Sequence, residues 1–252
     1  YDAVLDLQGN IKSAIVARVL SNSVIGYDKN SLREKPATWF YKKQFAVAYD
    51  MNVIWRAIAL IEKQFEMQLE IECILEKEPL LYFNSAAYSK AMTLWGEQDK
   101  KILFFVGASW PSKIYPFAQM IEVIKGLNRE VMIVWGSEEE ELFALRMQEA
   151  LPDLVSLMPK LSISELIAVV SMSDITIGGD TGPVHIAWAQ NRASVTIFGP
   201  TPSFRNTFIT PTNKVVDTGK TIDSFNLDRE DFSINTIKPT RIIAHIESLI
   251  GA

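Results

Sequence analysis

Hydrophobic residues make up 48% of this 252-residue chain and charged residues 22%, and the formal net charge is −5 at pH 7. These values are typical of a globular protein with one large domain or two ordinary ones, and they exclude a disordered or collagen-like chain. The acidic total, without a recognisable base-reading motif, excludes general nucleic-acid binding. One cysteine and two histidines are too few for a zinc site of the usual ligand types, so we expect no bound metal.

No apolar stretch approaches the roughly 18 residues needed to span a bilayer, and a single cysteine fits a reducing compartment. We therefore expect a soluble chain in the cytoplasm. The cations are concentrated in residues 10–63, which contain nine Lys or Arg against four Asp or Glu. Charge alone leaves two interpretations of this basic segment open, a solvated helical surface or a face that binds an anionic partner.

The first 100 residues combine one strand-like run with helical patterns. Apolar spacing favours helices from residue 31 to residue 74, with a break at Pro36, so few strands are expected in this stretch. Residues 76–100 contain turn-forming and charged residues and predict an interdomain linker with a short helix. The predicted elements are a strand at 1–6 and helices at 11–20 and 53–68.

From Lys101 onward, short strand-like runs alternate with helix-like runs. Consecutive strands joined in this way run parallel, because each connection is a crossover helix. The sequence therefore predicts an α/β fold with a parallel sheet covered by helices on both faces. The predicted strands are 102–106, 131–135, 154–157, 174–177 and 194–198, and the predicted helices are 116–127, 138–150, 162–170, 183–190 and 238–250.

The loop from Gly178 to Pro183 is a candidate ligand site, because open parallel sheets bind ligands beyond the carboxyl ends of their strands. Its glycines permit close approach to the backbone, and Pro183 fits the first turn of a helix whose free N–H groups attract anions. His185 lies in the same turn. The loop suits a diphosphate, and the alternative is a helix N-terminus capped by Asp180 or Thr181 with no ligand.

Three further loops follow predicted strands. Gly199–Pro202 is a second turn of the same kind as the first. Residues 107–113 end in Lys113, which either neutralises a phosphate or is an ordinary solvated lysine. Residues 136–141 contain four glutamates, one of which can accept the hydroxyls of a ribose. Glutamates also favour the start of a helix through the helix dipole, so most of them need no ligand role.

Three segments resemble a known family, the lipopolysaccharide heptosyltransferases of glycosyltransferase family 9: residues 1–14 (YDAVLDLQGNIKSA), 179–185 (GDTGPVH) and 198–201 (FGPT). The resemblance implies the GT-B fold, in which two Rossmann-like domains face each other. Within the family, the opening segment is most similar to the enzymes that add the first heptose to the Kdo region of lipid A. The implied domains are 1–95, an incomplete acceptor-side domain with its linker, then 96–236, the donor-binding domain, and 237–252, a closing helix.

The resemblance implies ADP-L-glycero-β-D-manno-heptose as the donor, no further cofactor, and catalytic roles for Lys113 and Asp180. Lys113 matches the lysine on the diphosphate, Glu140 the carboxylate on the ribose, and Leu161 the residue that packs on adenine. The implied donor-binding residues are Ala108, Ser109, Lys113, Glu140, Leu161, Asp180, Thr181, Gly182 and His185. The implied acceptor-side residues are Lys12, Arg33 and Arg56, which all lie in the basic segment and favour its interpretation as an anion-binding face.

Two positions depart from the family pattern. The family's general base is an aspartate near the N-terminus, which this sequence lacks; we expect it upstream, with roughly 80 to 90 further residues of the first Rossmann-like domain. The chain is thus interpreted as an N-terminally truncated fragment that is inactive alone. Tyr115 stands where the family usually has tryptophan.

The implied activity is an inverting, metal-independent transfer of heptose to the Kdo region of lipid A during lipopolysaccharide core biosynthesis. This acceptor implies a peripheral location at the cytoplasmic face of the inner membrane of a Gram-negative cell, with Trp39–Lys43 as contacts unless their aromatic rings are core residues. Two alternatives stay open. One is a transferase that adds heptose to heptose, or another ADP-heptose transferase, and the other is a non-catalytic nucleotide-sugar binding module.

Overall fold

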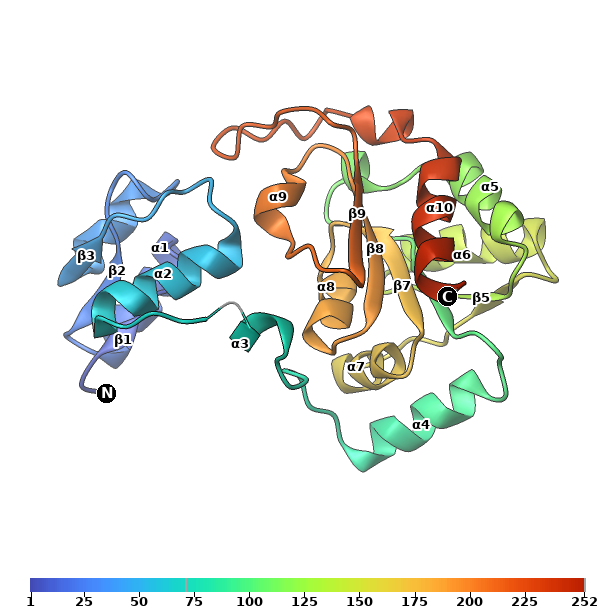
Figure 1. The fold of residues 1–252 in the computed structure, drawn as a ribbon, viewed down its shortest axis with the longest axis horizontal. Coiled ribbons are helices and arrows are strands. Elements are labelled where there is room, and N and C mark those ends of the chain that lie inside the picture. Colours follow the sequence, from blue (N-terminus) through green and yellow to red (C-terminus); the bar gives the residue numbers. More distant parts are fainter. Residues whose placement is uncertain (71, 252) are drawn as a thin grey trace. The chain divides into compact units, whose positions relative to one another are not determined.

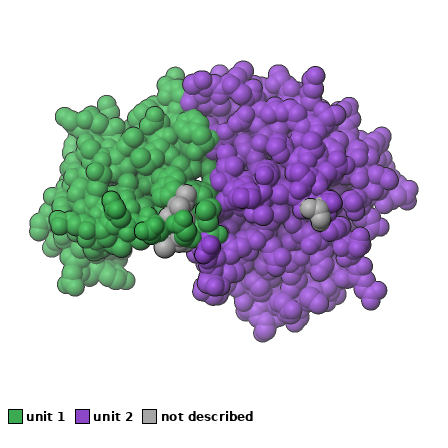
Figure 2. All heavy atoms as spheres, in the orientation of Figure 1, with its two compact units in different colours: residues 1–75, 204–208, 223–226 green, residues 76–203, 209–222, 227–252 purple. Residues whose placement is uncertain are grey.

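The computed structural model describes residues 1–70 and 72–251, without the side chain of Cys73. The chain forms two compact units (Figure 2). Unit 1 comprises Tyr1–Leu75, Phe204–Phe208 and Asp223–Asn226, and unit 2 comprises Glu76–Ser203, Ile209–Ile222 and Leu227–Ala252.

Unit 1 is built on a three-stranded parallel sheet in the order β1-β2-β3 (Figure 1). Asp6 turns the chain from β1 into α1, because its carboxylate accepts hydrogen bonds from the Gly9 backbone N–H (3.0 Å) and the Tyr41 hydroxyl (2.7 Å). Gly9 has φ +72°, and a Cβ there would lie 2.6 Å from the Leu32 side chain, so the turn requires glycine. The elements are β1 (Val4–Leu5), α1 (Ile11–Leu20), β2 (Val24–Tyr27), η1 (Lys35–Phe40), β3 (Lys43–Phe45), α2 (Val53–Phe65) and α3 (Glu72–Leu75).

Unit 2 contains a six-stranded parallel sheet in the order β6-β5-β4-β7-β8-β9. The chain starts in the middle of the sheet at β4, proceeds outward to β6, and returns to β7 on the other side of β4. The carboxyl ends of β4 and β7 therefore form the switch point where such sheets bind ligands. The strands are β4 (Ile102–Phe105), β5 (Val131–Val134), β6 (Val155–Leu157), β7 (Ile175–Gly179), β8 (Ala193–Phe198) and β9 (Asn213–Asp217).

Helices cover both faces of this sheet (Figure 1). In β4, Ile102 and Phe104 pack with α5, α6 and α10, whereas Leu103 and Phe105 pack with α4, α7 and α8. Alternate side chains of a strand point to opposite faces, so a strand buried on both faces must be apolar throughout. The helices of unit 2 with at least eight residues are α4 (Ser85–Trp95), α5 (Phe117–Leu127), α6 (Glu138–Ala150), α7 (Ile163–Ser171), α8 (Gly182–Ala189) and α10 (Pro239–Ile250), and its short ones are η2 (Pro111–Lys113) and η3 (Ser233–Thr236). The short helix α9 (Ser203–Asn206) lies mostly in the segment 204–208, which belongs to unit 1.

The predicted α/β class with a parallel sheet is confirmed, and the helices expected at 11–20 and 138–150 coincide with α1 and α6. The division of the chain differs from the expected one, because unit 1 ends at Leu75 rather than at residue 95. The helix that was expected in the linker, α4, packs on unit 2 instead. Its Trp95 is 1% exposed, and the indole Nε1 donates to the Val169 carbonyl at 3.1 Å.

Three strands were not predicted: β2, β3 and β9. The first two make unit 1 richer in strand than the helical spacing of its sequence indicates. Within the described ranges, none of the helices is long and apolar enough to cross a membrane.

Candidate functional site

A pocket of about 560 Å³ lies at the carboxyl ends of the unit 2 strands, at the switch point between β4 and β7. All its lining residues belong to unit 2. The lining includes every residue that the sequence analysis assigned to donor binding: Ala108, Ser109, Lys113, Glu140, Leu161, Asp180, Thr181, Gly182 and His185.

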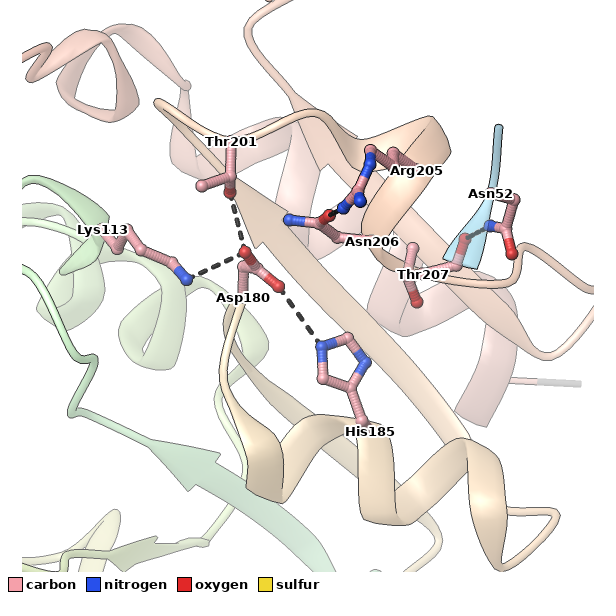
Figure 3. A network of polar contacts seen from close by, with 8 residues as sticks. All are labelled: Asn52, Lys113, Asp180, His185, Thr201, Arg205, Asn206 and Thr207. Atoms are coloured by element: carbon pink, nitrogen blue, oxygen red, sulfur yellow. Dashed lines mark hydrogen bonds and ion pairs between the residues drawn. The ribbon is translucent and has the colours of Figure 1, made fainter. Parts of the chain in front are cut away.

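Asp180 is the centre of the polar network in this pocket (Figure 3). Its Oδ2 atom lies 2.8 Å from Lys113 Nζ and accepts a hydrogen bond from the Thr201 hydroxyl, also at 2.8 Å. Its Oδ1 atom lies 3.2 Å from Nε2 of His185. Burial raises the pKa of Asp180, but the contacts with His185, Lys113 and Thr201 outweigh burial and hold the pKa well below its usual value. The carboxylate is therefore ionised throughout the neutral range.

Lys113 is 9% exposed and its ammonium group is paired with Asp180, so it is not an ordinary solvated lysine. The ammonium also lies 5.4 Å from the centre of the Trp110 ring. A buried cation held in this way is a fixed point charge at the pocket wall, where it can neutralise a phosphate.

The N-terminus of α8 follows Asp180 directly. Thr181 is the N-cap residue, but no side chain caps this helix, and Pro183 occupies its first turn. Among the described residues, the buried Thr181 hydroxyl has no hydrogen-bond partner. The alternative in which Asp180 or Thr181 caps the helix is thus not what the structure shows. In the first turn of α8, Val184 and His185 donate their N–H groups to the Thr181 carbonyl (3.2 and 3.4 Å) and Pro183 has none, so Gly182 is the residue left to present an N–H to the pocket.

Glu140, in the first turn of α6, is the glutamate of residues 138–141 that lines the pocket. Ser137 caps this helix by accepting from the Glu140 backbone N–H at 3.3 Å. The Glu140 side chain turns back, and its Oε2 atom accepts from the Gly136 N–H at 2.7 Å. A Cβ on Gly107 would lie 1.7 Å from Glu140 Oε1, so the absence of a side chain at Gly107 makes room for this carboxylate.

Apolar side chains form another part of the lining: Phe105, Val134, Trp135, Leu161 and Leu166. Among them, the family resemblance assigned a role only to Leu161. The position of such residues at the ends of the buried strands β4 and β5 could have identified them, because these strand ends reach the same edge of the sheet. An apolar wall beside a buried charge pair suits a ligand with an aromatic base and an anionic group.

The residues assigned to the acceptor side lie in unit 1. Arg33 and Arg56 line a second, smaller pocket, whereas Lys12 is exposed on α1 and is not part of its lining. Arg205 also lines this pocket and was not identified from the sequence. In the segment considered for membrane contact, Trp39 is 83% exposed but the Tyr41 side chain is buried in the core of unit 1.

The described residues contain no group of three His, Cys, Asp or Glu side chains that could hold a metal ion. A doubly wound parallel sheet with a pocket at its switch point defines the class of Rossmann-like α/β proteins. The family follows from a family model, glycosyltransferase family 9 (heptosyltransferase), that matches residues 1–231. The chain belongs to this family, and it is a glycosyltransferase of the GT-B class.

Two curated relatives are lipopolysaccharide heptosyltransferase 1 proteins. The one from Campylobacter coli is 38% identical over 263 residues, which cover 100% of this chain and 77% of the relative. The one from Salmonella typhimurium is 27% identical over 208 residues, covering 80% of this chain and 62% of the relative. The match thus spans less than two thirds of the Salmonella protein.

Two solved structures share the fold. Escherichia coli heptosyltransferase WaaC with ADP has a TM-score of 0.71 and 22% identity, over 98% of this chain and 72% of that one. A glycosyl transferase family 9 protein from Veillonella parvula has a TM-score of 0.75 and 17% identity, over 100% and 74% of the two chains.

Proposed function

We propose that the protein transfers heptose from ADP-heptose to the Kdo region of lipid A, as the resemblance implied. Membership of glycosyltransferase family 9 supports a heptosyl transfer, and the names of several relatives, lipopolysaccharide heptosyltransferase 1, support this acceptor. The observation that carries the proposal is the pocket of unit 2. It contains all nine residues assigned to donor binding, including the buried Lys113–Asp180 pair, and they come from the segments that follow four different strands.

The proposed donor lies with its diphosphate at Lys113 and the first turn of α8. In an inverting displacement the acceptor hydroxyl attacks the anomeric carbon as ADP leaves, and the leaving diphosphate gains negative charge in the transition state. Fixed positive charge at the pocket wall stabilises that state more than the ground state. Glu140 is proposed to accept the ribose hydroxyls, and Leu161, with its apolar neighbours, to pack on adenine.

Asp180 is better suited to holding Lys113 and His185 in place than to deprotonating the acceptor. A carboxylate whose pKa is lowered by three partners is a weak base, and general-base catalysis is most effective when the pKa lies near the working pH. We therefore propose that a group other than Asp180 is the general base.

Contact with the cytoplasmic face of the inner membrane is also proposed, because the acceptor is a glycolipid. Trp39 is the exposed aromatic residue in the segment considered, and Lys42 and Lys43 beside it are exposed cations. Such a combination favours an interface with anionic lipid headgroups.

An acceptor-exchange assay tests the proposed reaction. The complete gene product is incubated with ADP-heptose and either Kdo-bearing lipid A or the same lipid already carrying one heptose. We expect transfer to the first acceptor and little to the second. Transfer mainly to the heptose-bearing lipid would indicate the alternative, a transferase that adds heptose to heptose. Binding of ADP-heptose without transfer to either lipid would indicate a binding module instead.

A further inference from the structure

The second pocket, of about 250 Å³, is formed entirely by residues of unit 1. Its lining contains three guanidinium groups, those of Arg33, Arg56 and Arg205, and one carboxylate, that of Glu34. Glu34 Oε2 accepts from the backbone N–H of Ile11 at 2.9 Å, at the start of α1. The cations of the pocket therefore outnumber its anions, and the one anion already has a partner.

Arg56 is fixed in the pocket wall. It is 4% exposed, and its Nη2 atom donates to the Ser31 carbonyl at 2.7 Å. Its guanidinium carbon lies 4.2 Å from the ring centre of Tyr27 and 5.0 Å from that of Tyr49. The buried Nε atom has no hydrogen-bond partner among the described residues. An unsatisfied buried donor of this kind is costly without a compensating contact.

Arg205 approaches the same tyrosine. Its guanidinium carbon lies 4.4 Å from the ring centre of Tyr49, and its Nε atom donates to the Tyr49 carbonyl at 3.0 Å. The Asn52 side-chain amide holds the surrounding segment by donating to the carbonyls of Phe204 (3.0 Å) and Thr207 (2.7 Å; Figure 3). Arg205 is thus an ordered member of the pocket, although it lies about 150 residues from Arg56 in the sequence.

The charge of the pocket is unbalanced. Within the part of the chain that the structure describes, none of the three guanidinium groups forms an ion pair with a carboxylate. Burial is the main cause that lowers the pKa of Arg56, and the charge of Arg205 lowers it further. The guanidinium groups of Arg56 and Arg205 both lie against the Tyr49 ring, so their positive charges repel each other. An anion bound between them would be attracted to both and would offset this repulsion.

We propose that Arg205 is a further acceptor-binding residue, which together with Arg33 and Arg56 binds one oxyanion of the acceptor glycolipid, a carboxylate or a phosphate. The planar fork of a guanidinium group matches the geometry of both anions. This inference rests on the proposed function and deepens it, because it names the chemical group that the acceptor must present and adds a residue that the sequence did not indicate.

Steady-state kinetics of the complete gene product test the role of Arg205. At saturating ADP-heptose, Arg205→Gln should raise KM for the Kdo-bearing lipid at least about tenfold, since hydrogen bonds to charged groups are lost, with kcat and the donor KM unchanged within about twofold. Arg205→Lys should restore part of the loss. Arg18→Gln is the matched control, because Arg18 is an exposed arginine of α1 that does not line the pocket.

A second variant guards against a folding defect. Arg33 is exposed and makes no hydrogen bond or ion pair with the described residues, so Arg33→Gln should raise the acceptor KM without lowering the unfolding temperature. Acceptors lacking either the carboxylate or the phosphate charges identify the group bound. On the acceptor without that group, wild type and Arg205→Gln should have equal KM. An unchanged acceptor KM in Arg205→Gln, or a difference that survives removal of both groups, overturns the inference and leaves the proposed reaction intact.

If the wild-type protein transfers no heptose, the proposed function fails, and the arginine pocket of unit 1 is then tested by anion binding alone. Inorganic phosphate, added with saturating ADP so that the pocket of unit 2 is filled, should raise the unfolding temperature of the wild type and of Arg18→Gln more than that of Arg205→Gln. Equal rises in all three proteins overturn the inference.

Discussion

At the scale of single residues, Asp180 compensates the buried positive charge of Lys113 in the unit 2 pocket. A buried lysine such as Lys113 is tolerated only when its charge is compensated, and Asp180 lies 2.8 Å from it. Thr201 and His185 bind the remaining lone pairs of the same carboxylate. The network therefore keeps a cation in place before any ligand arrives, which is the preorganisation that electrostatic catalysis requires.

Asp180→Asn should lower the free energy of unfolding by about 3 kcal/mol or more at neutral pH, because it leaves Lys113 buried without its counter-charge. The pKa of Asp180 is lowered from its ordinary 3.8, so the native contacts of the carboxylate stabilise the fold above that pH and are lost as the pH falls through the lower folded value. Urea unfolding from pH 3 to 7 should show a constant difference between wild type and variant above about pH 5 and a smaller one below pH 4.

Asp153→Asn provides the control for that series, since Asp153 is exposed and should change the free energy of unfolding by no more than about 0.5 kcal/mol. A difference between wild type and Asp180→Asn that persists undiminished to pH 3 would contradict the assignment of the stabilisation to the ionised carboxylate.

The family resemblance assigned the individual residues of the unit 2 pocket, whereas the strand pattern predicted most of the loops that carry them, because the carboxyl ends of parallel strands meet at one edge. Contacts that depend on the order of strands in the sheet could not be predicted from the sequence. The hydrogen bond from Thr201 to Asp180 exists because β8 is paired with β7. Arg205 could not be predicted either, because the chain on either side of its segment belongs to unit 2. Residues 204–208 themselves pack with unit 1, and this brings Arg205 to the pocket that contains Arg56.

At the scale of elements, α4 shows how a segment interpreted as a linker becomes part of a core. Its apolar residues Ala87, Ala91 and Trp95 lie on one side and pack against α7 and the sheet. The turn-forming residues around the helix dominate the local pattern, whereas burial of the indole depends on a partner about 75 residues away. Composition therefore predicted the helix but not the unit to which it belongs.

Trp95→Ala should lower the free energy of unfolding by about 3–5 kcal/mol, the usual cost of removing a large buried aromatic side chain. Trp39→Ala, at an indole that is 83% exposed, should change it by no more than about 0.5 kcal/mol. Denaturant unfolding of the two variants gives the comparison. Equal small effects would mean that α4 is a detached linker after all.

The unpredicted strands share a physical cause. β2 contains Gly26, β3 has only three residues, and β9 begins and ends with polar residues. None of these runs has a strong strand pattern of its own, and each is stabilised by pairing with a neighbour in the sheet. The apolar strands β4 and β5 in the middle of the unit 2 sheet were predicted because burial on both faces requires apolar residues throughout.

At the scale of the whole molecule, the two pockets divide the proposed reaction between the two units. The residues proposed for the nucleotide sugar come from unit 2, and the arginines proposed for the acceptor come from unit 1. The two sets share no residue, so substitutions in one pocket should leave ligand binding by the other unchanged. Unit 1 with its arginine pocket is thus proposed to supply the acceptor site, which a nucleotide-binding domain alone does not provide.

The most direct test of the central claim is calorimetric titration of the complete gene product with ADP. We expect one ADP site, an affinity at least about tenfold lower in Lys113→Ala, where a charge-assisted contact is lost, and unchanged affinity in Arg205→Gln and in Lys125→Ala, an exposed lysine of α5. A folded protein that does not bind ADP, or that binds it equally well with and without Lys113, would contradict the assignment of the unit 2 pocket to the nucleotide-sugar donor.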